Sequence, residues 1–278
     1  MSAIARALRE AAQALEAISD TPRLDAELLL AHALGINRET LLLDPPDIDV
    51  PRSFSALVAR RAAGEPVAYI TGRRGFWTIE LEVGPGVLIP RPDSETLIAA
   101  AVEHFDGTAG PERILDLGTG SGALLLAALD QWPDASGIGI DRSQAALDQA
   151  RGNAAQLGLA ARADFSIGDW ARGITERFDL ILCNPPYVAT GAELGPGVAA
   201  YEPAEALLAG EDGLADLARL APVVGGLLTP LGFAAIEIGF DQDKSAASLF
   251  EKQGLSVAIA HDLGGRPRAL LIPGFISG

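Results

Sequence analysis

The chain has 278 residues, which exceeds one average domain and allows one large domain or two smaller ones. It carries 21 Lys and Arg residues against 37 Asp and Glu residues, so its formal net charge is −16 at pH 7. A protein dedicated to binding duplex nucleic acid needs a clustered surplus of positive side chains, and this charge argues against that class. The single cysteine, Cys183, excludes an internal disulfide framework and a cysteine-rich zinc site.

The start of the chain does not have the pattern of a targeting segment. Residues 1–20 lack the apolar stretch of a secretory signal, and their acids, Glu10, Glu16 and Asp20, are those that organellar transit peptides avoid. Elsewhere no uncharged apolar run approaches the roughly 18 residues that a membrane span needs. We therefore expect a cytoplasmic protein.

The first part of the sequence predicts a small helical domain over residues 1–65. Apolar residues repeat at spacings of three and four in the first segment, as one helix face requires: Ile4, Leu8, Ala11, Leu15 and Ile18. Capping residues then delimit three more helices, from Thr21-Pro22 to Gly35, from Asn37 through Leu43, and from Ser53 to Gly64. We expect this helical N-terminal domain to bind a partner.

Residues 66–90 change in character. Aromatic and β-branched residues dominate the segment, and glycines interrupt them at Gly72, Gly75, Gly84 and Gly86. This composition predicts a β-hairpin that links two domains.

Residues 91–278 predict an α/β domain, because short apolar strands alternate with helical stretches. We expect strands over 113–118, 136–141, 164–169, 178–186, 233–239, 255–262 and 268–275. We expect helices near 121–131, 143–157, 213–228 and 241–253. Such alternation is typical of a mostly parallel sheet with helices on both faces, and the last two strands, which no helix separates, indicate an antiparallel pair.

A glycine-rich turn follows the first of these strands. Gly118-Thr119-Gly120-Ser121-Gly122 leads into a helix, and Asp141 comes 19 positions after Gly122, at the tip of the next strand. Glycines let a backbone approach a ligand closely, and an acid at that tip can bind two ribose hydroxyls, so the pattern indicates a nucleoside-containing ligand. The spacing G-x-G-x-G counts against a dinucleotide. Alternatively, the glycines only cap a helix and Asp141 only begins the next one.

Two further residues refine the expected ligand. Asp116 precedes the glycines, where a carboxylate would repel a pyrophosphate and favour an ammonium group such as that of S-adenosylmethionine. Asp169-Trp170, at the end of the third strand, provides an acceptor and an aromatic face near the expected adenine position.

The fourth strand ends in Asn184-Pro185-Pro186-Tyr187. Ligands of open α/β sheets bind at the carboxyl edge of the strands, where this motif lies. The Asn184 side chain and the Pro185 carbonyl offer two acceptors for a planar NH₂ group, and the Tyr187 ring can stack on it. Such a nitrogen is a poor nucleophile, so the arrangement predicts catalysis of its methylation by alignment and hydrogen bonding.

These motifs resemble known families. LDLGTGSG with Asp141 resembles the Rossmann-like class I S-adenosylmethionine-dependent methyltransferases, and NPPY resembles those that methylate planar amino groups. With VLIPRPDSE (87–95), YEPAEALLAGEDGL (201–214), EIGFDQ (237–242) and the helical first domain, the whole chain resembles the HemK-type peptide chain release factor N5-glutamine methyltransferases. The resemblance implies a seven-stranded, mostly parallel sheet and a methyltransferase domain over 91–278.

The resemblance also implies an activity and its residues. A methyl group would pass from S-adenosylmethionine, leaving S-adenosylhomocysteine, to the glutamine side-chain amide of the release factors' Gly-Gly-Gln motif, without a metal. The implied cofactor-binding residues are Gly118, Thr119, Gly120, Ser121, Gly122, Asp141, Trp170 and Asn184. The implied substrate-binding residues are Asn184, Pro185, Pro186 and Tyr187, of which Asn184, Pro185 and Tyr187 are also catalytic. We expect a monomer whose partners are release factors, with neither a nucleic-acid substrate nor a membrane.

Two other functions stay open on the sequence. An adenine or cytosine amino methyltransferase would use the same four-residue motif, although the net charge of −16 argues against a nucleic-acid substrate. A non-catalytic module could keep the nucleoside pocket as a scaffold, although the intact motifs argue against loss of activity.

Overall fold

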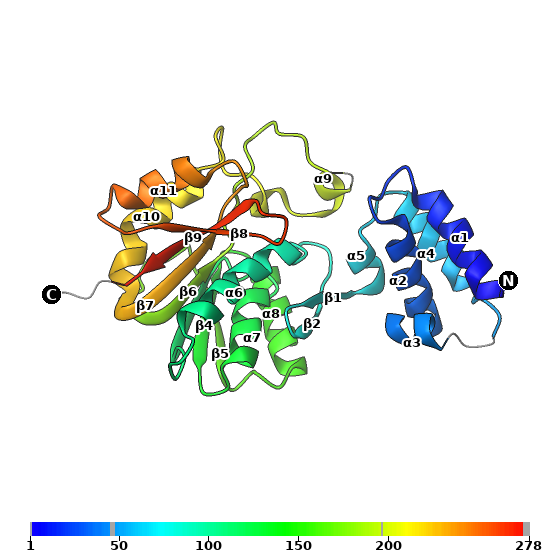
Figure 1. Ribbon diagram of the computed structural model, residues 1–278, viewed down its shortest axis with the longest axis horizontal. Helices are drawn as coiled ribbons and strands as arrows, with labels where there is room; N and C mark the ends of the chain where they lie inside the picture. The colour runs from blue at the N-terminus through cyan, green and yellow to red at the C-terminus, as the bar shows by residue number, and fades with distance from the viewer. Residues whose placement is uncertain (1, 45–47, 196, 275–278) are drawn as a thin grey trace. The chain divides into compact units, whose positions relative to one another are not determined.

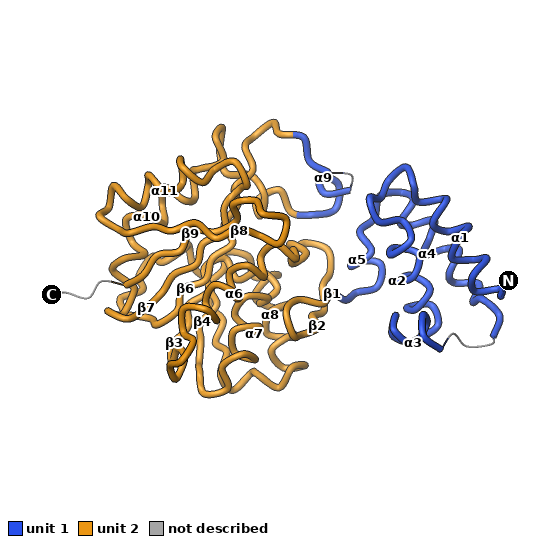
Figure 2. Tube along the Cα trace, viewed as in Figure 1, with its two compact units in different colours: residues 1–73, 193–202 blue, residues 74–192, 203–278 orange. Residues whose placement is uncertain are grey.

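The structure, a computed structural model, describes residues 2–44, 48–195 and 197–274. The chain divides into two compact units, which Figure 2 colours separately. Unit 1 comprises residues 1–73 and 193–202, and unit 2 comprises residues 74–192 and 203–278. The ten residues 193–202, which belong to unit 1, therefore interrupt the sequence of unit 2.

Unit 1 is helical, as predicted. Its helices are α1 (Ala3–Leu15), α2 (Pro22–Leu34), α3 (Arg38–Leu43), α4 (Ser53–Ala62), α5 (Val67–Thr71) and the short α9 (Val198–Tyr201). The four α1 residues of the predicted apolar face are buried, whereas Ile18 lies beyond the end of the helix and is only partly buried. Gly35, at φ +68°, ends α2, and the Asn37 side chain accepts a hydrogen bond from the Thr40 amide at 2.7 Å to cap α3.

The predicted hairpin is present but shorter than the range 66–90. Its strands are β1 (Arg73–Phe76) and β2 (Ile79–Glu82), and helix α5 takes up the start of the range. Pro66 and Gly72, at φ +73°, bound that helix, and its central residues are buried, so packing overrides the β propensity of this segment. Asn153 of unit 2 accepts from the Glu82 amide at 2.8 Å and donates to the Ser121 carbonyl at 2.9 Å, which joins β2 to the glycine loop.

Unit 2 contains a seven-stranded sheet in the order β5-β4-β3-β6-β7-β9-β8. Its strands are β3 (Arg113–Leu117), β4 (Ser136–Asp141), β5 (Ala163–Ile167), β6 (Phe178–Cys183), β7 (Leu228–Glu237), β8 (Ala258–His261) and β9 (Pro267–Pro273). Strands β3 to β7 pair in parallel, while β9 pairs antiparallel with both β7 and β8, as predicted for the last two strands.

Helices cover both faces of this sheet (Figure 1). Helices α6 (Glu95–His104), α7 (Ala123–Gln131) and α8 (Gln144–Gln156) lie on one face, and α10 (Ala215–Leu227) and α11 (Asp243–Glu251) lie on the other. Two short 3₁₀ turns, Pro92–Ser94 and Ala204–Ala206, complete the unit. The core between the layers is apolar and contains Cys183, which is fully buried, so burial raises the pKa of its thiol.

The strand order reverses between β3 and β6. The chain steps outward from β3 through β4 to β5, then returns to place β6 on the other side of β3. The register sets Leu117 beside Cys183, so the glycine loop and the NPPY motif leave neighbouring strands at the same edge. This edge is where ligands of open α/β sheets bind.

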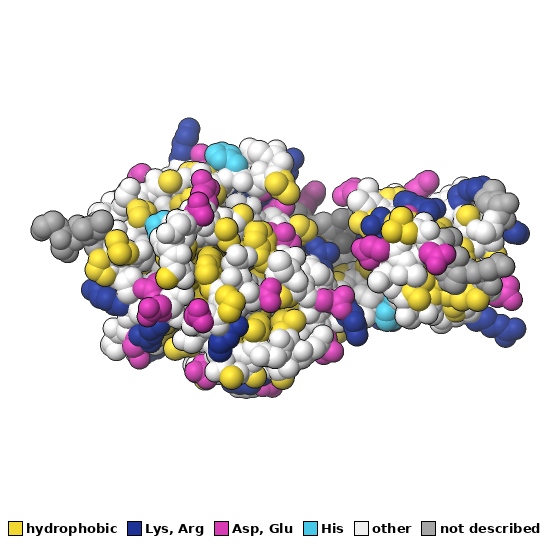
Figure 3. All heavy atoms as spheres, turned by 60° about the horizontal axis from the view of Figure 1, so that its bottom comes forward, with side chains coloured by type: hydrophobic (Ala, Val, Ile, Leu, Met, Phe, Trp, Pro, Cys, Tyr) yellow, Lys and Arg dark blue, Asp and Glu magenta, His cyan; other side chains and the backbone are white. Residues whose placement is uncertain are grey.

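Two general features of the molecule bear on its class. None of the helices in the described part of the chain is long and apolar enough to cross a membrane. On the face that Figure 3 shows, acidic and basic side chains of unit 2 are interspersed among apolar and uncharged surface, without gathering into one basic field.

Candidate functional site

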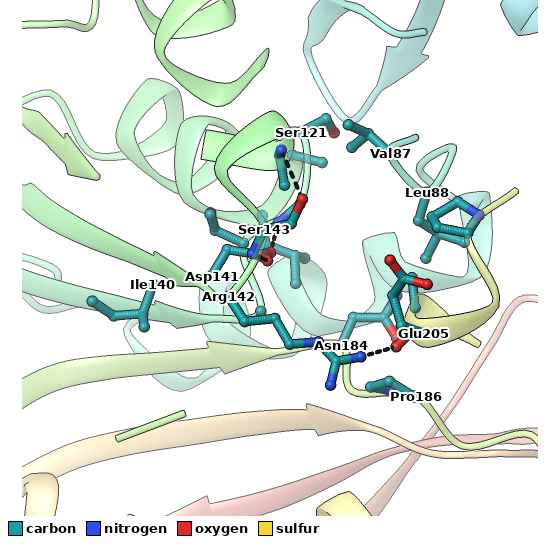
Figure 4. A pocket seen from close by; sticks show the side chains of 18 of the residues that line it. Val87, Leu88, Ser121, Ile140, Asp141, Arg142, Ser143, Asn184, Pro186 and Glu205 are labelled. Atoms are coloured by element: carbon teal, nitrogen blue, oxygen red, sulfur yellow. Dashed lines mark hydrogen bonds between the residues drawn. The ribbon is translucent and has the colours of Figure 1, made fainter. Parts of the chain in front are cut away.

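A cavity opens at the reversal point, at the carboxyl edge of the sheet (Figure 4). The loop after β3, the ends of β4 and β6, and the turn after β5 supply most of its walls, and segments near 86–94 and 203–206 close it. The structure thus brings Gly118, Asp141, Trp170 and Asn184, four of the residues expected in the site, around one space.

The glycine loop needs glycine at its first position. Gly118 has φ +75°, and a Cβ there would lie 3.2 Å from Cζ3 of Trp170. The amides of Gly118 and Thr119 donate to the Ile140 carbonyl at 2.8 and 3.0 Å. These two amides therefore tie the loop to β4.

Asp141 ends β4 and faces the cavity (Figure 4). One of its oxygens accepts from the Gly120 amide at 2.9 Å, and the other accepts from the Ser143 amide at 2.8 Å. A carboxylate has about four lone-pair sites, so each oxygen keeps capacity for another donor. The arrangement can bind a pair of vicinal hydroxyls.

Trp170 forms another wall of the cavity and is held in an unusual backbone conformation. Its φ is +52°, a left-handed value that costs a non-glycine residue about 1–3 kcal/mol. Its indole Nε1 donates to Asp216 at 3.0 Å. Arg219 bonds both Asp216 and Asp169, and this guanidinium lowers the pKa of the Asp169 carboxyl. The acceptor expected of Asp169 thus already has a cationic partner.

The NPPY motif divides between the cavity and the protein interior. Asn184 and Pro186 line the cavity, while Pro185 is buried and is not among the lining residues. The Asn184 Nδ2 group donates to the Ser94 hydroxyl at 3.0 Å. The Tyr187 ring is not part of the cavity wall either, and its hydroxyl donates to Glu237 at 3.1 Å.

Residues that the motifs did not single out complete the wall. Arg142 donates to the Glu205 carbonyl at 2.6 Å and so connects the end of β4 to the turn at 204–206 (Figure 4). Ser94 lines the cavity and is 3% exposed. Ser94 and Glu205 lie in stretches that carry the family resemblance, but only the fold shows that they approach the cavity.

Asp116 lies beneath the glycine loop. It is fully buried and does not line the cavity, which argues against the expected direct contact with an ammonium group. One carboxylate oxygen accepts from the Thr119 hydroxyl at 2.6 Å and the Leu125 amide at 3.3 Å; the other has no partner in the described chain. Burial raises its pKa to about 7.

A second buried carboxylate lies behind the NPPY motif. Glu237 is fully buried, and burial raises its pKa to about 7, against the opposing effects of Ser94, Tyr187 and Arg268. Arg268 pairs with Asp93 at 3.0 Å and with Asp262 at 3.1 Å. The end of the EIGFDQ stretch also supports the motif, because Gln242 donates to the Tyr187 carbonyl at 3.0 Å.

The described residues, 2–44, 48–195 and 197–274, contain no group of three or more His, Cys, Asp and Glu side chains that could hold a metal ion.

The fold and the cavity define a Rossmann-like methyltransferase domain. In agreement, the family model "Methyltransferase domain" matches residues 110–215, and the model "PrmC N-terminal domain" matches residues 6–72. Among similar solved structures, a methyltransferase from Pyrococcus furiosus has a TM-score of 0.55 at 20% identity and covers 80% of this chain and 100% of its own. A ribosomal protein L11 methylase from Lactobacillus delbrueckii subsp. bulgaricus has a TM-score of 0.51 at 19% identity, covering 69% and 84%.

Sequence relatives narrow the class to one family. The "Release factor glutamine methyltransferase" of Rhodospirillum rubrum is 45% identical and covers 91% of this chain and 79% of its own length. Proteins of the same name from Caulobacter vibrioides and Xylella fastidiosa are 41% and 43% identical, each over 91% of this chain and 89% and 94% of their own. The chain belongs to the release factor glutamine methyltransferase family, as the sequence motifs predicted.

Proposed function

We propose that this protein transfers a methyl group from S-adenosylmethionine to the side-chain amide nitrogen of the glutamine in the Gly-Gly-Gln motif of peptide chain release factors. The observation that carries the proposal is the placement of Asn184 in the same cavity as Gly118 and Asp141. A group that can hold a carboxamide thus lies beside groups that can hold a nucleoside.

The cavity suits the cofactor. Asp141 offers two oxygens suited to the ribose hydroxyls, Trp170 offers an aromatic wall, and the absence of a side chain at Gly118 leaves room beside that ring. When bound, S-adenosylmethionine supplies the methyl group as a sulfonium electrophile. We assign the cofactor to Gly118, Thr119, Gly120, Ser121, Gly122, Asp141, Trp170 and Asn184.

The chain's own contribution to the reaction is positioning. The Asn184 side-chain oxygen accepts one N–H of the substrate carboxamide. We assign the other N–H to the Pro185 carbonyl, which the substrate has to reach beyond the residues that line the cavity. These two bonds fix the nitrogen in place and strengthen as positive charge develops on it, which favours the transition state over the ground state. After the methyl transfer, the amide nitrogen carries one extra proton, which it releases to water. No side chain has to remove a proton before the methyl group arrives.

Each part of the chain has a proposed role. The helical domain over 1–65 binds the release factor, the segment 66–90 links it to the rest, and residues 91–278 carry the methyl transfer. Pro186 lines the substrate side of the cavity, and Tyr187, which lies outside the cavity wall, supports the motif through its hydrogen bond to Glu237. We further propose that the protein acts as a cytoplasmic monomer.

The test is incubation of the protein with S-adenosylmethionine and a purified release factor, followed by mass mapping of the peptide that contains Gly-Gly-Gln. One added methyl on the glutamine is expected, and none on a release factor whose glutamine is replaced by asparagine. Absence of methyl on the wild-type glutamine would refute the proposal.

The variant Asn184→Ala tests the proposed mechanism. Turnover should fall by about 10²–10³, the effect of losing one positioned polar group, while the affinity for S-adenosylmethionine, measured by calorimetry, stays within about threefold. The matched control is Gln156→Ala, which removes an exposed carboxamide on α8 and should leave turnover unchanged. Equal turnover in the two variants would exclude the role given to Asn184.

A further inference from the structure

We propose that Gln242 is a positioning residue that fixes the end of the NPPY motif at Tyr187 and thereby the direction of the Pro185 carbonyl. The inference rests on the proposed function, in which that carbonyl accepts one N–H of the substrate carboxamide. Gln242 is 8% exposed and does not line the cavity, so it acts only through the backbone of the motif.

The side-chain amide of Gln242 joins three segments of unit 2. Its Nε2 group donates to the Tyr187 carbonyl at 3.0 Å and to the Gly213 carbonyl at 3.3 Å. Its Oε1 atom accepts from the Gly239 amide at 2.9 Å. A carbonyl can only accept and a backbone amide can only donate, so these partners determine which end of the Gln242 side chain faces the motif. Both protons of its NH₂ group are used.

The Tyr187 carbonyl is closely surrounded by these partners. Gly213 has φ +73°, and a Cβ there would overlap the Tyr187 carbonyl oxygen and lie 2.7 Å from Nε2 of Gln242. Glycine at this position therefore lets the three groups approach one another. In such a packed space the carbonyl has little freedom to turn while Gln242 is bonded to it.

The rest of the motif is stiff because of its two prolines. The rings hold φ of Pro185 and Pro186 near about −65°, and each proline restricts the residue before it to an extended conformation. At the other end of the motif, Asn184 follows strand β6, which pairs with β3 and β7 up to Cys183. A stiff segment that is fixed at one end can still rotate at that end. The second attachment, at Tyr187, therefore determines where the Pro185 carbonyl points.

Other backbone bonds hold the same end of the motif. The Val188 amide donates to the Leu207 carbonyl at 2.9 Å, and the Ala209 amide donates to the Val188 carbonyl at 2.9 Å. These bonds join the motif to a loop, whereas Gln242 joins it through Gly239 to the end of β7. Loss of the Gln242 amide should therefore misdirect the motif without releasing it.

Gln242→Met keeps the length of the side chain and removes all three hydrogen bonds. At saturating release factor, we expect kcat to fall by about 10-fold, short of the roughly 10²-fold that a misplacement of about 1 Å costs, because the Val188 bonds remain. Here kcat is expressed per molecule that binds S-adenosylmethionine, with the number of binding molecules measured by calorimetry. The same titration should give a Kd for S-adenosylmethionine within about threefold of wild type.

Counting the binding molecules separates positioning from a general loss of structure. A purely structural role would lower the number of molecules that bind S-adenosylmethionine and leave kcat per binding molecule unchanged. The matched control is Gln253→Met, at an exposed position after α11, which should keep the wild-type kcat and Kd.

A spectroscopic measurement observes the Tyr187 carbonyl without turnover. Tyr187–Val188 is the only Tyr–Val peptide bond in the sequence. Protein with ¹³C-carbonyl tyrosine and ¹⁵N valine therefore gives a single signal that correlates this carbonyl with the Val188 amide. The carbonyl frequency should shift in Gln242→Met, because a hydrogen-bond donor is lost, and stay in place in Gln253→Met.

The two measurements together decide the proposal. A carbonyl signal unmoved by Gln242→Met overturns it, and so does a shifted signal with the wild-type kcat per binding molecule. Should Gln242→Met not fold, Gln242→Glu replaces it, because burial keeps the new carboxyl group neutral and its single proton cannot serve both carbonyls. The signal and kcat should then both change, and a wild-type value of either overturns the proposal. Shifted signals alongside a wild-type protein that methylates no glutamine would refute the proposed function alone.

Discussion

At the scale of single residues, Asp116 combines complete burial with a carboxylate oxygen that has no partner in the described chain. Burial disfavours the charged form and raises the pKa of Asp116 in the folded protein to about 7, whereas the ordinary pKa of an aspartic acid is 3.8. Below about pH 3.8 the Asp116 carboxyl group is protonated in both the folded and the unfolded protein, so its burial does not lower the stability of the fold. As the pH rises, the unfolded chain loses the proton first, so the stability of the fold decreases until the folded pKa is passed.

We therefore predict that Asp116→Asn gains stability relative to wild type as the pH rises from about 4 to about 7. The asparagine oxygen can still accept from Thr119 and Leu125, and no charge has to be buried. The free-energy difference should grow by at most roughly 1.4 kcal/mol per pH unit and level off above the window. Urea unfolding at a series of pH values measures it. Glu237 titrates in the same window in both proteins, so the difference isolates Asp116.

The control for this prediction is Asp106→Asn at an exposed position of unit 2. Its stability should follow the wild-type pH dependence. A constant difference between Asp116→Asn and wild type across the window would show that the carboxylate ionises as easily in the fold as in the unfolded chain.

The cavity residues were easier to predict from the sequence than the side chains that form hydrogen bonds with them. Asp141 and Asn184 follow strands directly, so a strand prediction and the rule for the carboxyl edge are enough to bring them together. The Ser94–Asn184 bond joins residues 90 positions apart, and the Tyr187–Glu237 bond joins residues 50 apart. Such pairs depend on how helices and strands pack, and a local pattern carries no record of that packing.

At the scale of elements, β4 carries a glycine whose missing side chain makes room for the loop before α7. A Cβ at Gly139 would lie 2.7 Å from the Thr119 hydroxyl and 2.8 Å from a ring carbon of Phe165. We predict that Gly139→Ala destabilises the protein by about 1–3 kcal/mol, because a packed interior tolerates an added methyl group poorly. Thr119 would have to shift, and the loop bond to Asp116 would shift with it.

Gly152 offers the opposite case on α8. It is exposed, and a Cβ there would meet nothing within 4 Å, so Gly152→Ala should stabilise the protein by about 0.4–1 kcal/mol. The urea unfolding midpoints of Gly139→Ala, Gly152→Ala and wild type measure both effects on stability. A midpoint that Gly139→Ala leaves unchanged or raises would exclude the steric role of Gly139, and a midpoint that Gly152→Ala lowers would contradict the predicted stabilisation.

The element boundaries show where local patterns stop being informative. The helix caps of unit 1 were predictable because Asn37 and Gly35 act within one turn of their own helices. Strand β7 begins at Leu228, five positions before the predicted start, because its first residues pair with β6 across an irregular register near Phe178. That extension depends on a neighbouring strand, which periodicity in one segment does not reveal.

At the scale of the whole molecule, the chain divides into two compact units, and no local pattern predicts one of the segments of unit 1. Residues 193–202 belong to the same compact unit as residues 1–73. Gly197, at φ +83°, packs so closely there that a Cβ would overlap the Gly64 carbonyl. The two glycines lie 133 positions apart in the chain (197 − 64). Position 197 requires glycine for two reasons, because its φ is positive and because the Gly64 carbonyl leaves no room for a Cβ.

The net charge of −16 is also a property of the whole molecule. It favours the proposed protein substrate over a nucleic-acid substrate. A protein that holds a phosphate backbone releases counterions, so its affinity falls by about 0.9 logarithmic units per contact for each tenfold rise in salt. The interspersed charges on the face of unit 2 that Figure 3 shows offer no continuous basic track for such contacts. A base in a duplex would also have to be extracted from its stack before it could reach the cavity.

We predict that labelled methyl from S-adenosylmethionine enters a release factor and does not enter DNA or RNA, at about 0.15 M salt and at about 0.02 M salt. Lowering the salt is the decisive step, because it strengthens any electrostatic binding to phosphates by orders of magnitude. Filter binding with a lysine-rich peptide checks that the nucleic acid can be captured at low salt. Methyl on adenine or cytosine with none on the release factor would reverse the assignment of the substrate, while leaving the planar NH₂ group as the shared chemical target.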